Sequence, residues 1–114
     1  MDHRELAAEL FLSDCNCAQA VLEAFSDVTG LEKSFAAKLA SSFGGGMGRM
    51  REVCGAVSGM LMVAGLLYGY DDPGENDVNK KAHYQLVQNL AGQFREKIGS
   101  IICREILSNP PSDP

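Results

Sequence analysis

The sequence is poor in positive charge and shows no β pattern. Ten Lys and Arg residues stand against fifteen Asp and Glu residues, which gives a net charge of -5. Nucleic acids and anionic membranes require clustered Lys and Arg, so this balance argues against either as the main partner. No stretch alternates polar and apolar residues with a period of two, which argues against a sheet. No Ser/His/Asp arrangement and no carboxylate pair stands out as a catalytic constellation.

The sequence also lacks a basic and apolar segment of the secretory type at its start, where residues 2–9 have mixed charge. We therefore expect a cytoplasmic location, where thiols are kept reduced. In that setting the four cysteines indicate redox activity, metal binding or simple burial, and not a permanent disulfide framework. Neither Cys-x-x-Cys nor Cys-x-x-Cys-His occurs, which excludes a thioredoxin-like motif and covalent haem attachment.

What is present is helical periodicity. Apolar residues recur at helical spacing, between capping residues and glycine stops, over most of the chain. The predicted helices cover residues 2–12, 15–28, 31–43, 50–67, 76–97 and 101–107. A turn is predicted at Asp71-Asp72-Pro73-Gly74, and the proline-rich residues 109–114 are predicted to form a disordered tail. We therefore predict an all-α fold: one domain over residues 1–108, a compact bundle of five to six helices around a buried Gly/Ala-rich central helix.

The predicted central helix carries no formal charge from residue 53 to residue 70. Such a run must be buried, in a protein core or in a bilayer. Its glycines and serine dilute the hydrophobicity, and the amphipathic neighbouring helices need a core partner, so we expect a core helix and no membrane span. The glycine pairs 55/59 and 65/69 have GxxxG spacing and would also suit a close homodimer contact.

Three of the four cysteines fall at or near predicted helix N-termini: Cys17, Cys54 and Cys103. A helix N-terminus has free N–H groups and a partial positive charge, which favour the thiolate and make the sulfur a better nucleophile or metal ligand. Burial of inert cysteines is the alternative. The nearby cationic side chains are Arg49, Arg51 and Arg104.

The fourth cysteine, Cys15, forms a Cys-x-Cys pair with Cys17. Such a pair can chelate a soft metal or form a strained disulfide, or it can be a coincidence, because only Cys17 is in the helical register. The spacing of the four cysteines does not match a zinc ribbon.

A glycine-rich loop, Gly44-Gly45-Gly46-Met47-Gly48, precedes the predicted central helix. The backbone at Gly45 and Gly46, with the side chains of Arg49 and Arg51, is a candidate site for an anion or an anionic cofactor. The loop lacks the Lys-Ser/Thr of a P-loop and follows no strand. We favour the simpler interpretation, a tight turn between two helices that leaves Cys54 open to approach.

Four segments occur in one order along the chain: Asn16-Cys17-Ala18-Gln19-Ala20-Val21, Gly44-Gly45-Gly46-Met47-Gly48-Arg49, Cys54-Gly55-Ala56-Val57-Ser58-Gly59 and Cys103-Arg104-Glu105. Together they resemble the C_GCAxxG_C_C family, whose hallmark is a CGAxxG segment. The resemblance covers residues 17–107. It implies a small bacterial or archaeal protein with a thiol-based or metal-linked redox role, and it assigns that role here to Cys17, Cys54 and Cys103. A further family cysteine has no counterpart after Cys103, so we expect either a set of three or Cys15 in its place.

The leading hypothesis is a redox-active protein. Cys54 is the expected attacking thiolate, and Cys17 or Cys103 is its partner in a reversible disulfide. Alternatively, Cys17, Cys54 and Cys103 are the ligands of an iron–sulfur cluster or zinc. The electron partner is unknown. A second hypothesis is a non-catalytic helical module that binds a metal, a small ligand or a partner protein, and a third is a helical domain with inert cysteines.

Overall fold

The computed structural model describes residues 2–71 and 78–108, and it is all-α as predicted. The longer helices are α1 (His3–Leu12), α2 (Cys17–Ala24), α4 (Lys33–Ala40), α6 (Gly55–Tyr68) and α7 (Val78–Ile98). The short elements are α3 (Ser26–Thr29), the 3-10 turn η1 (Ser41–Phe43), α5 (Gly44–Met47) and α8 (Cys103–Ile106). Across the two described ranges there is no β-strand, only an isolated antiparallel bridge between Val53 and Ile102.

Side-chain caps set the start of the first two helices. The Asp2 carboxylate accepts from the Glu5 N–H at 2.8 Å, and the Glu5 side chain accepts from the Asp2 N–H in return. Asn16 forms the same reciprocal box with Gln19. Both pairs have the spacing of a capping box, so these two helix starts can be read from the sequence.

Some predicted boundaries were wrong. The predicted helix over 15–28 is divided at Phe25 into α2 and α3. The central helix begins at residue 55 and not at residue 50, because Arg51 has a φ of 62°, which is incompatible with a right-handed helix. The last helix was predicted from residue 101, but α8 begins at residue 103 with Ile102 as its N-cap. Of the predicted turn at 71–74 only Asp71 is described, and the N-cap of the long helix and the tail over 109–114 lie outside the described residues.

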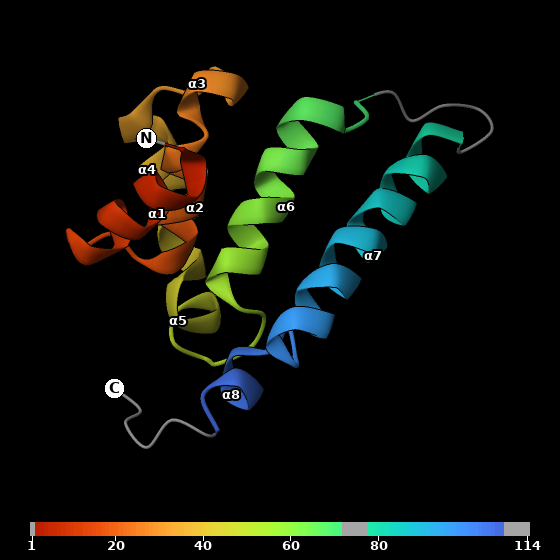
Figure 1. Ribbon diagram of the computed structural model, residues 1–114. Helices are drawn as coiled ribbons and strands as arrows, with labels where there is room; N and C mark the ends of the chain where they lie inside the picture. The colour runs from red at the N-terminus through yellow and green to blue at the C-terminus, as the bar shows by residue number, and fades with distance from the viewer. Residues whose placement is uncertain (1, 72–77, 109–114) are drawn as a thin grey trace.

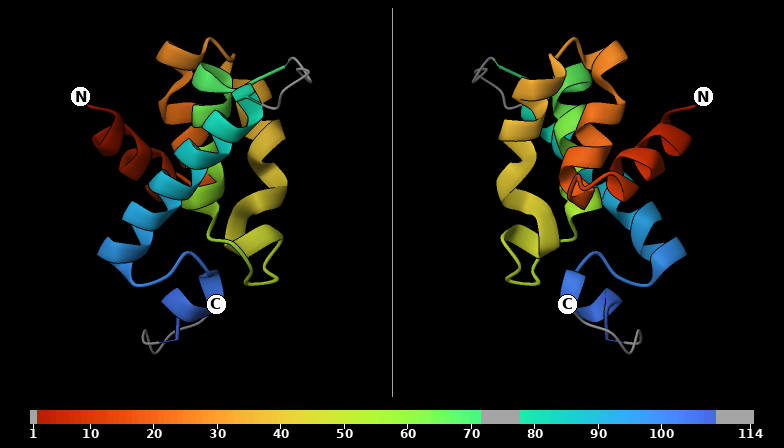
Figure 2. Two further views of the ribbon diagram at one scale, coloured as in Figure 1. Left: turned by 90° about the vertical axis from the view of Figure 1, so that its right-hand side faces the viewer. Right: turned by 90° about the vertical axis from the view of Figure 1, so that its left-hand side faces the viewer.

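The core lies between α2, α4 and α6. Figure 1 shows α6 in the middle of the molecule, with α1 to α4 on one side and α7 on the other, and Figure 2 shows α7 crossing α6 at an angle. Small residues bring the backbones together: a Cβ on Gly59 would lie 2.9 Å from the Ala18 carbonyl oxygen of α2. The buried core cluster consists of Ala18, Leu22, Ala36, Ala40 and Val63.

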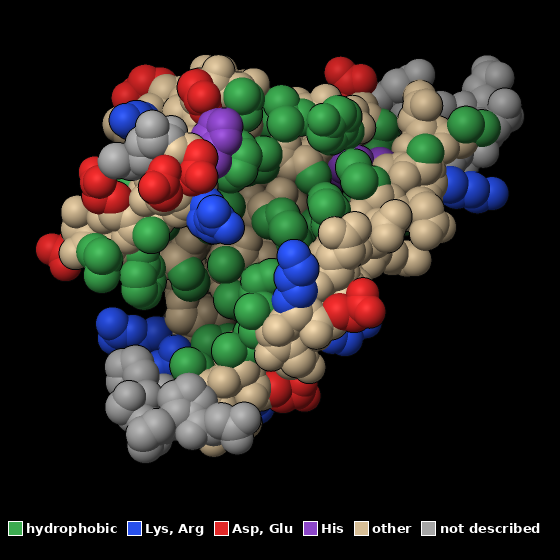
Figure 3. Space-filling view, in the orientation of Figure 1, with side chains coloured by type: hydrophobic (Ala, Val, Ile, Leu, Met, Phe, Trp, Pro, Cys, Tyr) green, Lys and Arg blue, Asp and Glu red, His purple; other side chains and the backbone are tan. Residues whose placement is uncertain are grey.

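The uncharged run is buried at one end only. Gly55, Val57 and Gly59 at the start of α6 are buried, whereas Leu66 and Tyr68 at its end are 46% and 69% exposed. Figure 3 shows apolar side chains gathered over the middle of the face that is turned to the viewer in Figure 1, between α1 and α7. Among residues 2–71 and 78–108, no helix combines the length and the hydrophobicity that crossing a membrane requires.

The first glycine pair of α6 is used inside the chain. Gly55 and Gly59 both pack against α2, so they are not free for the homodimer contact that their spacing suggested. Gly65 is exposed, and a Cβ placed on it would meet nothing within 4 Å. The homodimer remains a prediction, now without the support of the pair at 55 and 59.

Candidate functional site

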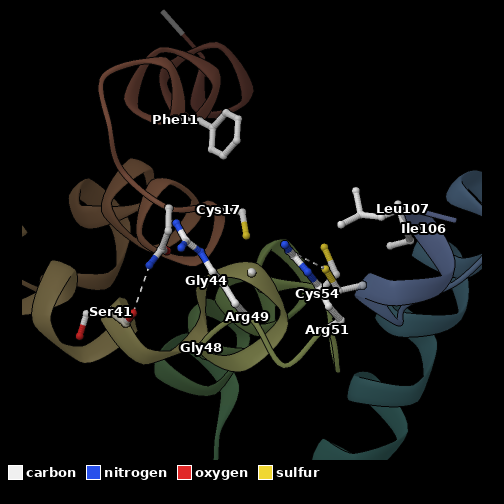
Figure 4. Close-up of a pocket in the computed structure, with 13 residues that line it drawn as sticks. Phe11, Cys17, Ser41, Gly44, Gly48, Arg49, Arg51, Cys54, Ile106 and Leu107 are labelled. Atoms are coloured by element: carbon white, nitrogen blue, oxygen red, sulfur yellow. Dashed lines mark hydrogen bonds between the residues drawn. The ribbon is translucent and has the colours of Figure 1, made fainter. Parts of the chain in front are cut away.

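A pocket of about 650 Å³ lies where the N-termini of α2 and α6 meet the glycine-rich loop and α8 (Figure 4). Three cysteines line it, Cys17, Cys54 and Cys103. They come from segments far apart in the sequence and stand at three helix starts: Cys54 is the N-cap of α6, and the other two are the first residues of α2 and α8. The prediction that these three cysteines lie at helix N-termini is therefore confirmed. The other lining residues are Phe11, Asn16, Ser41, Gly44, Gly45, Gly48, Arg49, Arg51, Ile106 and Leu107.

The floor of the pocket is a left-handed turn. All five residues from 45 to 49 have a positive φ, between 66° and 74°. A left-handed conformation costs about 1–2 kcal/mol per residue for residues other than glycine. The glycines at 45, 46 and 48 adopt it without that cost, whereas Met47 and Arg49 adopt it in a strained conformation. The N–H groups of Gly48 and Arg49 bond to the Gly44 carbonyl. The amides of Gly48 and Arg49 are therefore used within the loop.

The glycine turn packs directly on Cys103. A Cβ on Gly46 would lie 2.6 Å from Cys103 Cβ and 2.8 Å from Arg51 Cα. Real Cβ atoms do not approach so closely, so only glycine allows the turn to lie against this cysteine. Gly46 is thus a packing residue and does not itself line the pocket, whereas Gly45 does.

The antiparallel bridge aligns Cys54 with Cys103. Val53 pairs with Ile102, the Cys54 N–H donates to the Ile101 carbonyl at 2.8 Å, and the Cys103 N–H donates to the Glu52 carbonyl at 2.5 Å. Residue 103 is therefore the diagonal neighbour of residue 54 on the same face of the bridge. Such neighbours have Cα atoms about 7–8 Å apart, just outside the range of about 4.4–6.8 Å that a disulfide usually spans. The bridge therefore makes Cys54 and Cys103 near neighbours at the pocket, with separate thiols.

Cys17 reaches the same place from α2. Its Sγ lies against Gly55, in the space that a Cβ would occupy there, and the Phe43 carbonyl closes the other side of that space at 2.9 Å. The glycine in the Cys54-Gly55 pair thus makes room for the thiol of α2 beside the N-cap of α6.

Two of the three arginines near the cysteines have protein partners. Arg51 donates from Nη1 to Cys103 Sγ at 3.8 Å, and it lies beside Cys54 in Figure 4. Arg104 forms an ion pair with Glu52 at 3.0 Å and does not line the pocket. Arg49 lines the pocket and is exposed.

Burial raises the pKa of the Cys54 thiol above its ordinary value of 9.0. The N–H groups of Ala56 and Val57 act in the opposite direction, and the neighbouring Cys17 and Cys103 raise the pKa further. The sequence had suggested that the helix N-terminus would favour the thiolate. The terminus does act in that direction, but desolvation is the larger effect, so the pKa of Cys54 is raised and not lowered.

Cys15 does not line the pocket. Its Sγ donates to Glu23 Oε2 at 3.5 Å. Burial, followed by this hydrogen bond, raises the pKa of Cys15 above 9.0. The structure therefore brings three of the four cysteines together and leaves Cys15 with a carboxylate.

The described arrangement adds no support for the suggested metal centre. Among residues 2–71 and 78–108, no group of three or more His, Cys, Asp or Glu side chains is placed to hold a metal ion. All four cysteines are free thiols. An iron–sulfur cluster or zinc bound by Cys17, Cys54 and Cys103 stays a prediction from the sequence.

Sequence reasoning did not assign a role to several residues of the pocket. Asn16 could have been found from its capping-box spacing to Gln19, and its Nδ2 also donates to the Ser41 carbonyl at 3.2 Å, joining α2 to η1. Phe11, Ile106 and Leu107 add an apolar rim that only the packing of α1 and α8 reveals.

Comparison with protein families identifies the family of the chain. The model of the family described as "Putative redox-active protein (C_GCAxxG_C_C)" matches residues 15–113, nearly the whole chain. No curated protein and no solved structure matched the chain. Because the family match covers well over half of the chain and includes all four cysteines, the chain belongs to the C_GCAxxG_C_C family.

Proposed function

We propose that the protein carries out thiol–disulfide exchange, with Cys54 and Cys103 alternating between two thiols and one disulfide. The observation that carries the proposal is the antiparallel bridge, which holds these two cysteines as diagonal neighbours on one face at the edge of a pocket. Reversible exchange needs an attacking sulfur and a second sulfur within reach, and the bridge supports this pair because it makes the two residues neighbours.

The difference in exposure between the two cysteines supports an order for the two steps. Cys54 is half-buried and open to the pocket, whereas Cys103 is 9% exposed. The thiolate of Cys54 attacks one sulfur of a substrate disulfide, forms a mixed disulfide and releases the first substrate thiol. Cys103 then attacks Cys54 Sγ, which forms the protein disulfide and releases the second substrate thiol. Two electrons pass from the protein to the substrate disulfide, and the two thiol protons are recovered on the two released thiols.

Arg51 and Gly46 are the supporting residues in this proposal. The guanidinium of Arg51 donates to Cys103 Sγ, and the glycine turn packs against the Cys103 side chain. Both contacts keep the second sulfur next to the pocket in the reduced state. Cys17 is the alternative second sulfur, because its Sγ lies against Gly55, next to Cys54.

We further propose that the protein works in the cytoplasm. The exchange as written starts from free thiols, which a reducing compartment maintains. The electron donor that reduces the protein disulfide again is a second protein or a small thiol.

The test is differential alkylation of the reduced protein before and after treatment with a mild disulfide oxidant, read by intact mass. We expect two thiols to disappear, a reductant to restore them, and peptide mapping to join Cys54 to Cys103. The Cys103→Ser variant should stop at the mixed disulfide, whereas Cys15→Ser should behave as the parent protein. If peptide mapping instead joins Cys17 to Cys54, Cys17 and not Cys103 is the second sulfur.

Thiols that are not alkylated either before or after oxidant treatment would refute the exchange mechanism. Metal analysis of the same sample would then distinguish the alternative, a non-catalytic helical module that binds a metal, from a domain with inert cysteines. A stoichiometric metal content would favour the module.

A further inference from the structure

The cysteine pocket has a charge opposite to that of the protein as a whole. The chain has a net charge of -5, yet the described residues that line the pocket include Arg49 and Arg51 and neither Asp nor Glu. Glu52, which is adjacent in sequence to Arg51, is turned away into an ion pair with Arg104 at 3.0 Å. The charged residues in the described lining of the pocket are therefore positive, in a protein that is acidic as a whole.

Arg49 is the cation that is positioned for a ligand. Within the described residues its side chain forms no ion pair and no hydrogen bond, whereas Arg51 bonds to Cys103. The stem of Arg49 lies over Gly45, where a Cβ would be 2.8 Å from Arg49 Cγ. Its backbone is held at a φ of 66°, a strained conformation that costs about 1–3 kcal/mol for a residue other than glycine. Arg49 therefore lines the pocket with a strained backbone conformation.

We propose that the disulfide reduced at this site is a small one that carries a carboxylate, and that Arg49 binds that carboxylate. This inference rests on the proposed thiol–disulfide exchange and names its substrate class. A guanidinium binds a carboxylate through two parallel hydrogen bonds, which would fix the substrate sulfur relative to Cys54. The pocket volume of about 650 Å³ is that of a small-molecule site. The apolar rim of Phe11, Ile106 and Leu107 would contact the carbon chain of the substrate.

The test compares three small symmetrical disulfides that differ in charge: 3,3′-dithiodipropionate, bis(2-hydroxyethyl) disulfide and cystamine. The rate of oxidation of the reduced protein is measured with each and divided by its rate with the same protein unfolded in urea, which removes intrinsic reactivity. We expect the anionic disulfide to be favoured over the neutral one by about tenfold at low salt, and the cationic one to be slowest. The preference should shrink as salt is added.

Matched variants locate the effect. Arg49→Gln should abolish the preference for the anionic disulfide, and Arg49→Lys should retain part of it, since the charge remains but the two-pronged geometry is lost. Arg95→Gln removes the same charge from an exposed position on α7 that does not line the pocket, and it should leave the preference unchanged. Thermal melting verifies that each variant is folded.

The outcomes separate the two proposals. Equal corrected rates for the three disulfides would overturn the carboxylate site and leave the exchange mechanism standing. If no disulfide oxidises the protein, the exchange mechanism fails, and calorimetry with the non-reducible dicarboxylate 3,3′-thiodipropionate decides on the anion site. Binding that is lost in Arg49→Gln would support that site, and absence of binding to the parent protein would refute it.

Discussion

Cys15 and Cys17 are two residues apart and lie in opposite electrostatic surroundings. Cys17 lines a pocket with two arginines, while Cys15 donates to the carboxylate of Glu23. Asn16 separates them because it caps α2: Cys17 is the first helical residue, and Cys15 remains outside the helix. Meanwhile Cys17, Cys54 and Cys103 meet from distant segments. The comparison teaches that proximity in sequence is a poor guide to which thiols act together.

The largest expected effect comes from filling the space that admits Cys17. In Gly55→Ala the new Cβ would overlap Cys17 Sγ and lie 2.9 Å from the Phe43 carbonyl oxygen, so we expect a loss of about 1–3 kcal/mol in the free energy of unfolding. Gly65→Ala is the matched control, since its Cβ meets nothing within 4 Å and helix propensity should add about 0.5–1 kcal/mol. Urea denaturation measures both. Equal effects at the two glycines would contradict the packing of Cys17 against α6.

Removing the cap between the two cysteines should have the next largest effect. Asn16→Ala deletes the side chain that accepts from the Gln19 N–H at 2.8 Å, which should lower the free energy of unfolding by about 0.5–2 kcal/mol. Ser34→Ala, at an exposed position in the first turn of α4, where Glu32 is the cap, should change it by less than about 0.5 kcal/mol. If Asn16→Ala is as stable as the Ser34→Ala control in urea, the cap does not hold Cys17 in place.

The raised pKa of Cys54 predicts a pH dependence. Its alkylation by iodoacetamide should be slower at pH 7.5 than in the unfolded chain and should rise about tenfold per pH unit through pH 9.0 and beyond. Because the folded-state pKa is raised, the stability linked to this thiol is fully present below pH 9.0 and is lost as the pH rises through the folded-state pKa. Thermal melts between pH 7 and pH 10.5 should show this loss, and Cys54→Ser should reduce it. A Cys54 that is alkylated faster in the folded protein would reverse the sign of the shift.

The smallest effect should be at Cys15. Glu23→Gln removes the carboxylate but leaves the burial that contributes most to the raised pKa. Alkylation of Cys15 should therefore become faster by less than about tenfold, equivalent to less than one pKa unit. The exposed Glu9→Gln is the control, and peptide mapping should show the rates at Cys17 and Cys54 unchanged. A larger increase at Cys17 than at Cys15 would mean that the two environments are not separate.

The helices were predictable where a local signal specifies them. Apolar residues at helical spacing predicted the all-α fold and the start of α1 to within one residue. The start of α2 was predicted two residues early, because the capping box of Asn16 and Gln19 was not recognised. The start of α6 was missed by five residues because the glycine-rich segment forms a left-handed turn, and glycine allows many conformations without selecting one.

For the site, the sequence by itself determined the chemistry that is available: three cysteines at helix starts, a glycine-rich segment and two arginines that follow it. These features are local, since a helix start depends on its own cap and its first turn. Only the tertiary structure decided which thiols meet, which arginine bonds to Cys103, and that burial outweighs the helix N-terminus at Cys54. The physical reason is that desolvation and the approach of α2, α6 and α8 depend on contacts between residues far apart in the chain, which no local pattern encodes.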